Sequence, residues 1–347
     1  MDIFSTATLV QTVPNLKTSQ NWLLDRFFPN VVTYETEEVA IDVEVGSRRM
    51  APFCSPLVQG KIVESRRYQT NTFKPAYIKD KRVPDLRKPI KRQFGERIGG
   101  EFTLAERAMY NMQAEMEDQI DGTNRRLEWM AAKALQTGKV TIKGEGFETT
   151  EVDFGRDSDL TITLTGANMW PTTIVAGNTK PTDDLEAWAT RVLQKSGVVV
   201  TDVVFTSKSW KAFKCDERVI KNGIEQPLLS PYNNAVNPGT HVQVGAIYMG
   251  RWGQFDLWLY NDWFIDPDDN IEKPMIDDGS VVLSGSQLQG TRAFGAILDD
   301  EFNYGAMAYA PKTWVEKDPG QRFIMMQSAP IIIPSRVNAS FCAKVTQ

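Results

Sequence analysis

The sequence predicts an α+β protein built around one very long helix. Apolar residues recur at helical spacing over residues 103–137, which at ~1.5 Å per residue amounts to a helix about 50 Å long. Residues 139–154 then alternate as a β-hairpin does, and strand-like stretches return after residue 291. Between these parts, residues 182–290 combine two helical patterns with alternating, aromatic-rich strands, which is typical of a compact α+β unit.

The ends of both principal helices carry recognisable signals. Gly138 directly follows the long helical pattern, where glycine is favoured because it adopts the left-handed conformation that ends a helix. The apolar pattern stays in phase across Gly122, so we expect one helix, kinked at most there, rather than two. Thr182 is expected to cap the second helix, which would end at Gly197. The buried face of that helix would consist of Leu185, Trp188, Val192 and Leu193.

Charge is distributed unevenly along the chain. The 347 residues carry a formal charge of −5, yet residues 48–97 hold 14 lysines and arginines against four acids, a net +10 that leaves −15 for the rest. Five of the 18 prolines fall in this block, which shows little helical periodicity. Ordering a chain costs about 1–2 kcal/mol per residue in backbone entropy, so a thin, extended arm of this kind is expected to lie on another surface.

A second copy of the same anionic chain is the favoured partner for this cationic arm. The anionic remainder of the chain would repel a nucleic acid. The cationic block is also an extended arm rather than a recognition helix, so nucleic acid is the less favoured partner. The predicted contacts between subunits are the basic residues Arg48, Arg49, Lys61, Arg66, Arg67, Lys74, Lys79, Lys81, Arg82, Arg87, Lys88, Lys91 and Arg92.

Composition and motifs argue against an enzyme. The three cysteines form no C-x-x-C pair, which fits a reducing compartment and argues against a disulfide or zinc framework. The single histidine, His241, excludes a multi-histidine metal site, and its place in a turn indicates a structural or surface role. No nucleotide-binding, zinc-protease or hydrolase signature occurs. We therefore expect no catalytic residue, no cofactor and no metal.

Two clusters that could hold a ligand are interpreted as structural. Asp266, Asp268, Asn270 and Asp277 fall at calcium-loop positions, but Ile271 replaces the required glycine and the flanks are strands, so a solvated hairpin tip is expected. Aromatic residues in alternating strands usually fill a half-buried sheet, so core packing is favoured over a stacking platform for sugars or bases. These residues are Tyr248, Trp252, Trp258, Tyr260 and Trp263.

The termini give no sign of a membrane or of secretion. The N-terminal residues lack the basic start and apolar core of a signal peptide, and no run reaches the ~18 apolar residues of a membrane span. A cytosolic protein is expected.

The order of these parts resembles the capsid fold of tailed phages. Several stretches also resemble the lambda-like major capsid protein E family, in the same order and at similar spacing from about residue 25 to the C-terminus. They are FFPNVVTYETEEVAIDV, SPLVQGKIVESRRYQTNTFKPAYIKDKRV, TTEVDFGR and APKTWVEKDPGQRFIMMQSAPIIIP. The resemblance is weakest over residues 197–290.

The resemblance implies an organisation and a function. Residues 1–47 would be an N-terminal arm, 48–100 an extended loop (E-loop), 101–180 and 291–347 a peripheral domain with its spine helix, and 181–290 an axial domain. The chain would be the major capsid protein of a phage head, assembling into hexamers and pentamers of an icosahedral shell around double-stranded DNA that it does not bind sequence-specifically. Further partners would be a scaffold protein, a portal and, in some relatives, a decoration protein. Assembly would take place in the host cytoplasm.

Two alternatives remain open at this point. An encapsulin-like compartment shares the fold and encloses enzymes, and a soluble α+β enzyme or carbohydrate-binding protein would use the tryptophan cluster and the acidic loop. One branch of the wider fold joins subunits by a Lys-Asn isopeptide bond, but no motif places Lys61, Lys74 or Lys79 opposite an asparagine. No covalent cross-link is therefore expected.

Overall fold

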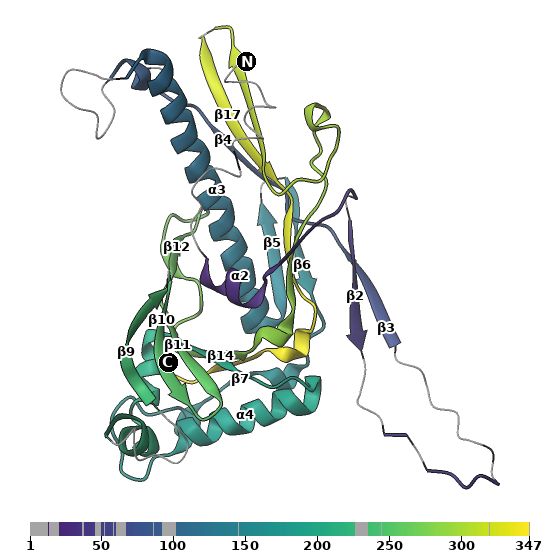
Figure 1. Cartoon of the computed structure of the whole chain (residues 1–347), viewed down its shortest axis with the longest axis vertical. Helices are drawn as coiled ribbons and strands as arrows, with labels where there is room; N and C mark the ends of the chain where they lie inside the picture. The colour runs from purple at the N-terminus through teal and green to yellow at the C-terminus, as the bar shows by residue number, and fades with distance from the viewer. Residues whose placement is uncertain are drawn as a thin grey trace.

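Figure 1 shows the computed structural model of the chain. It describes residue 13 and residues 21–36, 38–45, 50–51, 53–57, 59, 67–85, 87–91, 102–144, 146–225, 235–243, 245–318 and 320–346. Within these ranges, no helix is both long enough and apolar enough to cross a bilayer.

The longest element is α3 (Leu104–Thr137), a helix of 34 residues. A capping box fixes its start, because the Thr103 hydroxyl accepts from the Glu106 amide while the Glu106 carboxylate accepts from the Thr103 amide. It ends at Gly138, whose φ of +70° is left-handed and whose amide donates to the Ala134 carbonyl. The predicted single helix is confirmed, and it continues through Gly122.

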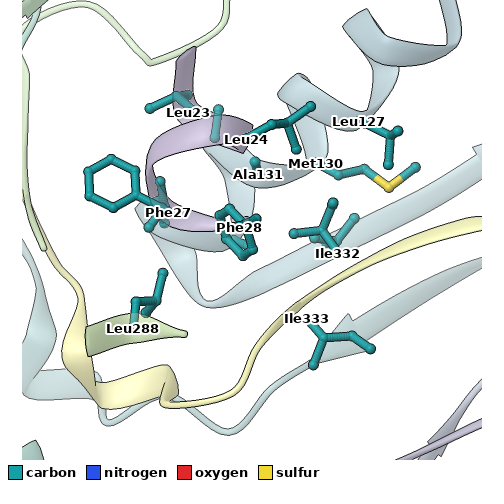
Figure 2. Packing of buried hydrophobic residues seen from close by; sticks show 14 of the residues in the cluster. Leu23, Leu24, Phe27, Phe28, Leu127, Met130, Ala131, Leu288, Ile332 and Ile333 are labelled. Atoms are coloured by element: carbon teal, nitrogen blue, oxygen red, sulfur yellow. The ribbon is translucent and has the colours of Figure 1, made fainter. Parts of the chain in front are cut away.

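The main apolar core lies beside the C-terminal half of α3. Helix α2 (Trp22–Phe27) directs its apolar face into this core, and Figure 2 shows its side chains near those of α3 and of β18. A three-stranded sheet completes it, with β1 (Asn30–Thr33) parallel to β15 (Gly290–Phe294) and β15 antiparallel to β18 (Pro330–Pro334). The predicted hairpin after α3 is confirmed as β5 (Lys139–Gly144) and β6 (Phe147–Asp153).

A seven-stranded mixed sheet forms the second unit. Its order is β7 (Thr161–Thr163), β19 (Phe341–Lys344), β14 (Ser280–Ser284), β8 (Asp202–Phe205), β11 (Phe255–Tyr260), β10 (Ala246–Trp252) and β9 (Ala235–Gln243). Helices α4 (Lys180–Ser196) and α5 (Ser207–Phe213) share a second apolar core with it. The α+β unit predicted for residues 182–290 is present, and β7 and β19 from either side of that range complete one edge of its sheet.

The start of α4 corrects one prediction. Thr179, not Thr182, precedes the helix, and Pro181 lies in its first turn, where a missing amide hydrogen costs nothing. Thr182 is instead buried and hydrogen-bonded to Asp216, with its amide and its hydroxyl both donating to Oδ2 at 3.0 and 2.9 Å. Leu193 is also exposed rather than part of the buried face.

The remaining elements extend from this body. β16 (Ala310–Glu316), β17 (Gln321–Ser328) and β4 (Ile78–Arg82) form an antiparallel sheet beside the N-terminal half of α3. β2 (Val39–Val45) pairs with β3 (Arg67–Phe73), and β12 (Trp263–Ile265) pairs with β13 (Glu272–Pro274). Short helical turns are η2 (Lys88–Ile90), η3 (Ser158–Leu160), η4 (Gly166–Asn168), η5 (Val219–Glu225), η6 (Ser286–Leu288), η7 (Asp300–Phe302) and η8 (Val337–Ala339).

Candidate assembly surface

A β-hairpin projects from one edge of the body. We call residues 39–73, which comprise β2, β3 and the chain between them, the E-loop hairpin. Val39 and Phe73 at its root pack against the main core, and Figure 1 shows β2 and β3 extending away from the body beyond them. Its pairing runs from Val39 opposite Phe73 to Val45 opposite Arg67. The projecting hairpin therefore begins nine residues before the predicted 48–100 segment and includes only its first part. The later part of that segment returns to the body as β4 and η2.

The far end of this hairpin carries highly exposed apolar side chains, which have no packing partner among the residues that the structure describes. We call the described residues between its strands, 50, 51, 53–57 and 59, the E-loop tip. Met50, Phe53 and Leu57 are 89%, 101% and 94% exposed. Single exposed apolar side chains are common, but several gathered in one short segment mark an interaction site. The tip is therefore the strongest contact signal in the described part of the chain.

The root of the hairpin is fixed to the body. The Tyr34 amide donates to the Phe294 carbonyl at 2.8 Å, and Pro75 is buried against Gly295. On the other side, the Tyr77 hydroxyl donates to Oε1 of the fully buried Gln327 at 2.8 Å. Because both strands enter the body at anchored residues, the direction in which the hairpin leaves it is defined by the fold.

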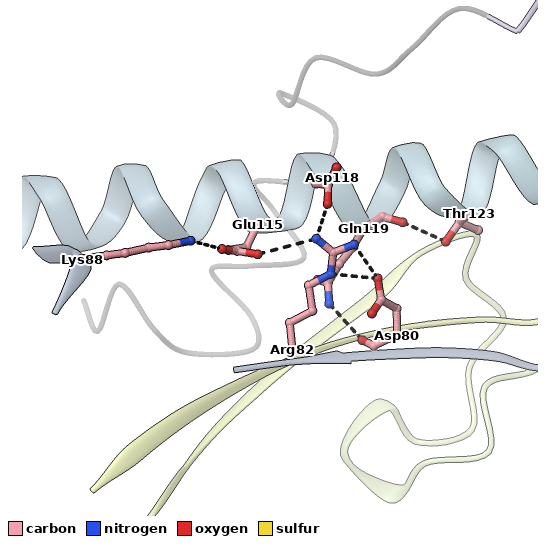
Figure 3. Close-up of polar contacts among 7 residues, drawn as sticks. All are labelled: Asp80, Arg82, Lys88, Glu115, Asp118, Gln119 and Thr123. Atoms are coloured by element: carbon pink, nitrogen blue, oxygen red, sulfur yellow. Dashed lines mark hydrogen bonds and ion pairs between the residues drawn. The ribbon is translucent and has the colours of Figure 1, made fainter. Parts of the chain in front are cut away.

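Arg82 and Lys88, both predicted contact residues, form ion pairs within their own chain. Figure 3 shows Arg82 of β4 in ion pairs with Asp80, with Glu115 and with Asp118, the last two on α3. Lys88 of η2 also pairs with Glu115, its Nζ lying 2.6 Å from Oε1. These pairs hold β4 and η2 onto α3, so Arg82 and Lys88 have a role in the fold of the single chain.

The other described cations lie on the surface. The Lys81 ammonium sits 4.2 Å from the ring centre of Phe323 and 5.2 Å from that of Trp314, and the Lys79 ammonium sits 5.1 Å from that of Tyr77. Three more cations of the same block are exposed: Lys74, Arg87 and Lys91. Arg67 lies in β3 by its backbone, and five other predicted residues fall outside the described part of the chain: Arg48, Arg49, Lys61, Arg66 and Arg92.

Sequence reasoning missed two buried carboxylates that anchor α2. Glu128 of α3 accepts hydrogen bonds from the amides of Leu23 and Leu24, at 2.9 and 3.0 Å. Asp202 of β8 pairs with Arg26 at 2.7 Å and accepts from the indole of Trp258 at 3.0 Å. Both carboxylates are fully buried. The only available signal was the place of Glu128 next to Leu127 in the apolar stripe of the helix.

The acidic cluster lies around the turn of a hairpin, and most of the aromatic cluster lies in the two cores. Asp266 lies at the end of β12, where Lys273 pairs with it at 2.6 Å across the hairpin. The described residues contain no group of three or more histidine, cysteine or acidic side chains that could hold a metal ion. Trp252, Trp258 and Tyr260 are buried in the two cores, whereas Trp263 is exposed. His241 lies in β9 opposite Tyr248.

A long helix, a hairpin that leaves the body and a sheet-based second unit form a fold that is shared with capsid proteins. A crystal structure described as that of a prophage capsid protein from Escherichia coli CFT073 has the same fold, with a TM-score of 0.75 over 99% of both chains at 21% identity. The capsid of a native GTA particle is more distantly similar, with a TM-score of 0.53 at 10% identity over 95% of this chain and 92% of that one.

Sequence comparison defines the family. Residues 5–345 match the model of the phage major capsid protein E family, and the chain belongs to that family. It is 30% identical to the major capsid protein of Escherichia phage N15 over 345 residues and 29% identical to that of Escherichia phage lambda, with 96% of both chains covered in each case. The protein is therefore a structural component of the virion capsid and not an enzyme. The resemblance seen in the sequence is confirmed, and the encapsulin-like and soluble-enzyme alternatives are not supported.

Proposed function

We propose that the E-loop hairpin of each copy reaches onto the next copy and so builds the hexamers and pentamers of an icosahedral head. The observation that carries this proposal is the E-loop tip, where Met50, Phe53 and Leu57 stand at 89%, 101% and 94% exposure on a hairpin that projects from the body. Burying them against another copy removes apolar surface from water at a gain of about 25 cal/mol per Å².

Charge supports the same partner. Residues 48–97 carry +10 and the remainder of the chain −15, so the arm of one copy meets a surface of opposite sign on another. An exposed ion pair contributes only about 0–1 kcal/mol. The predicted cationic contacts would therefore determine which partner is chosen and in what register the two copies meet. Most of the binding free energy between copies would come from the apolar tip.

The two halves of the fold have different places in the proposed capsomer. The unit with the seven-stranded sheet would be the axial domain that converges at its centre, and α3 with the three-stranded sheets would be the peripheral domain. Strand pairing favours including residues 161–163 and 341–344 with the axial residues 181–290, because they complete that sheet.

Other partners follow from the same role. The shell would enclose double-stranded DNA without sequence-specific contacts, since the bulk of the chain is anionic and phosphate binding depends on cationic surfaces. Assembly in the host cytoplasm on a scaffold protein, with a portal at one vertex and a decoration protein as a further candidate, completes the proposal.

The triple substitution Met50→Ser, Phe53→Ser and Leu57→Ser tests the role of the tip. The side chains contact nothing in the described chain, so the monomer should keep its melting temperature. Sedimentation velocity should show loss of shells and large capsomers in favour of monomers. The matched control is Ile174→Ser, which replaces another exposed apolar side chain and should leave assembly unchanged. Normal shells from the triple variant would contradict the proposal.

A further inference from the structure

An exposed apolar face lies on the edge of the molecule opposite the E-loop hairpin. It belongs to the β12–β13 hairpin, where Trp263, Ile265 and Ile271 are 47%, 68% and 58% exposed. Phe264 points the other way and packs against the main core. In Figure 1, β12 lies on one side of α3 and β2 with β3 on the other.

This face is held firmly rather than left on a loose loop. The guanidinium of Arg125 on α3 donates to the Trp263 carbonyl at 2.6 Å. Lys273 bridges Asp266 and Asp269 at 2.6 and 2.7 Å, which ties the two strands together at the turn. A preorganised surface loses little conformational entropy when a partner binds it.

The surroundings of the face are acidic in sequence. Residues 262–278 contain seven acids and one lysine. Four of those carboxylates pair with cations from neighbouring elements, among them Asp262 with Arg125 and Asp268 with Lys143. The pairing moderates the negative charge without making the face cationic, so a partner that is both apolar and cationic fits it best.

The E-loop tip is apolar, and in sequence it lies within the cationic block of residues 48–97, between Arg49 and Lys61. The geometry permits the match only between copies. When a patch on one edge of one copy binds a different patch on the opposite edge of the next copy, the contact is head-to-tail. Head-to-tail contacts close into a ring when the rotation between successive copies allows it. We propose that the face of Trp263, Ile265 and Ile271 receives the E-loop tip of a second copy. This inference rests on the proposed function and names the receiving surface.

Cross-linking through Cys54 tests the inference directly. Cys54 is an exposed thiol within the E-loop tip, whereas Cys215 and Cys342 are buried. The variant Ile265→Cys places a second exposed thiol on the receiving face. Treatment of assembled shells with a short bis-maleimide should join Cys54 of one copy to position 265 of the next, giving a ladder of multiples of 39.1 kDa on a denaturing gel.

Two controls separate this result from chance proximity. Ile174→Cys adds an equally accessible thiol away from the face and should yield at least tenfold less ladder, and Cys54→Ser in the Ile265→Cys background should abolish it. Shells that form normally while Ile265→Cys gives no more ladder than Ile174→Cys would overturn the receiving surface but leave the proposed function standing. Failure of the wild-type chain to form any shell would overturn both.

Discussion

The carboxylate of Glu128 on α3 accepts a hydrogen bond from the hydroxyl of Tyr260 on β11, at 2.9 Å. The same oxygen accepts from the Leu23 amide, and the second oxygen accepts from the Leu24 amide. One buried side chain therefore joins α3, the seven-stranded sheet and the first turn of α2. The relative position of the two halves of the subunit depends on this carboxylate together with the core around it.

Glu128 should make the stability of the unassembled chain depend on pH. Burial raises the pKa of Glu128 to about 7, above the 4.5 of a free glutamate, despite its three hydrogen bonds. Between these values the folded chain holds a proton that the unfolded chain has lost, so the free energy of unfolding should fall as pH rises from 4.5 to 7 and then level off. A shift of this size corresponds to about 3 kcal/mol.

Urea denaturation at pH 5, 6, 7 and 8 measures this slope, and Glu128→Gln should remove it because glutamine does not titrate. Glu115→Gln is the control, since Glu115 pairs with cations near the surface of the same helix. A slope that persists unchanged in Glu128→Gln would show that another group is responsible.

Replacing two glycines of the α3 region by alanine should change the stability of the chain in opposite directions. Gly138 has a φ of +70°, and a Cβ there would clash with Cβ of Arg156. Gly138→Ala should therefore destabilise the chain by about 1–2 kcal/mol from the backbone alone and by more from the clash. Gly122 lies inside the helix with no atom within 4 Å of a new Cβ, and Gly122→Ala should stabilise by about 0.5–1 kcal/mol. Thermal unfolding measures both, and equal effects would refute the cap geometry.

Replacing Arg82 should lower the stability of the monomer, whereas replacing Arg87 should not. Arg82 pairs with Asp80, Glu115 and Asp118, so Arg82→Ala should lower the stability of the monomer, by about 1 kcal/mol for partly exposed pairs of this kind. Arg87 is exposed, and Arg87→Ala should leave the melting temperature unchanged. Calorimetry of the unassembled chain distinguishes them; an unaffected Arg82→Ala would mean that these pairs contribute nothing to the fold.

Charge reversal at exposed cations should impair assembly in a salt-dependent way. The double variant Arg87→Glu and Lys91→Glu introduces repulsion against an anionic neighbour, and this repulsion is strongest at low salt because the screening length is about 30 Å at 0.01 M and about 8 Å at 0.15 M. Light scattering should show slower assembly at low salt and partial recovery as salt is added. Lys317→Glu reverses an exposed charge outside the cationic block and should have a smaller effect. Equal effects of the two variants would argue against a specific role for the block.

The elements that could be predicted from sequence are those with local causes. The α3 helix follows from its own apolar spacing and from Gly138, and the projecting arm follows from charge and proline content. β4 could not be assigned to the body sheet, because the pairing of Arg82 with Ile324 joins distant parts of the chain. Thr182 shows the same limit, since its hydroxyl is engaged by Asp216, 34 residues away.

The contact surface was predictable only in part, because some of its features depend on parts of the chain that are distant in sequence. Net charge identified the arm. Charge alone does not reveal that Arg82 is paired within the chain, or that Met50, Phe53 and Leu57 are exposed among the described residues. Glutamate within an amphipathic helix normally faces water, so Glu128 gave little sign of burial. Its partner amide at Leu23 lies 105 residues away in sequence.

Shortening the E-loop hairpin is the most direct test of the account. Val45 and Arg67 face each other in the β2–β3 register, so residues 46–66 can be replaced by Asn-Gly, a two-residue turn that suits such a pair. Negative-stain microscopy of the purified full-length chain should show closed shells, and the shortened chain, with an unchanged circular dichroism spectrum, should show none. Closed shells of normal size from the shortened chain would contradict the claim that this hairpin joins one subunit to the next.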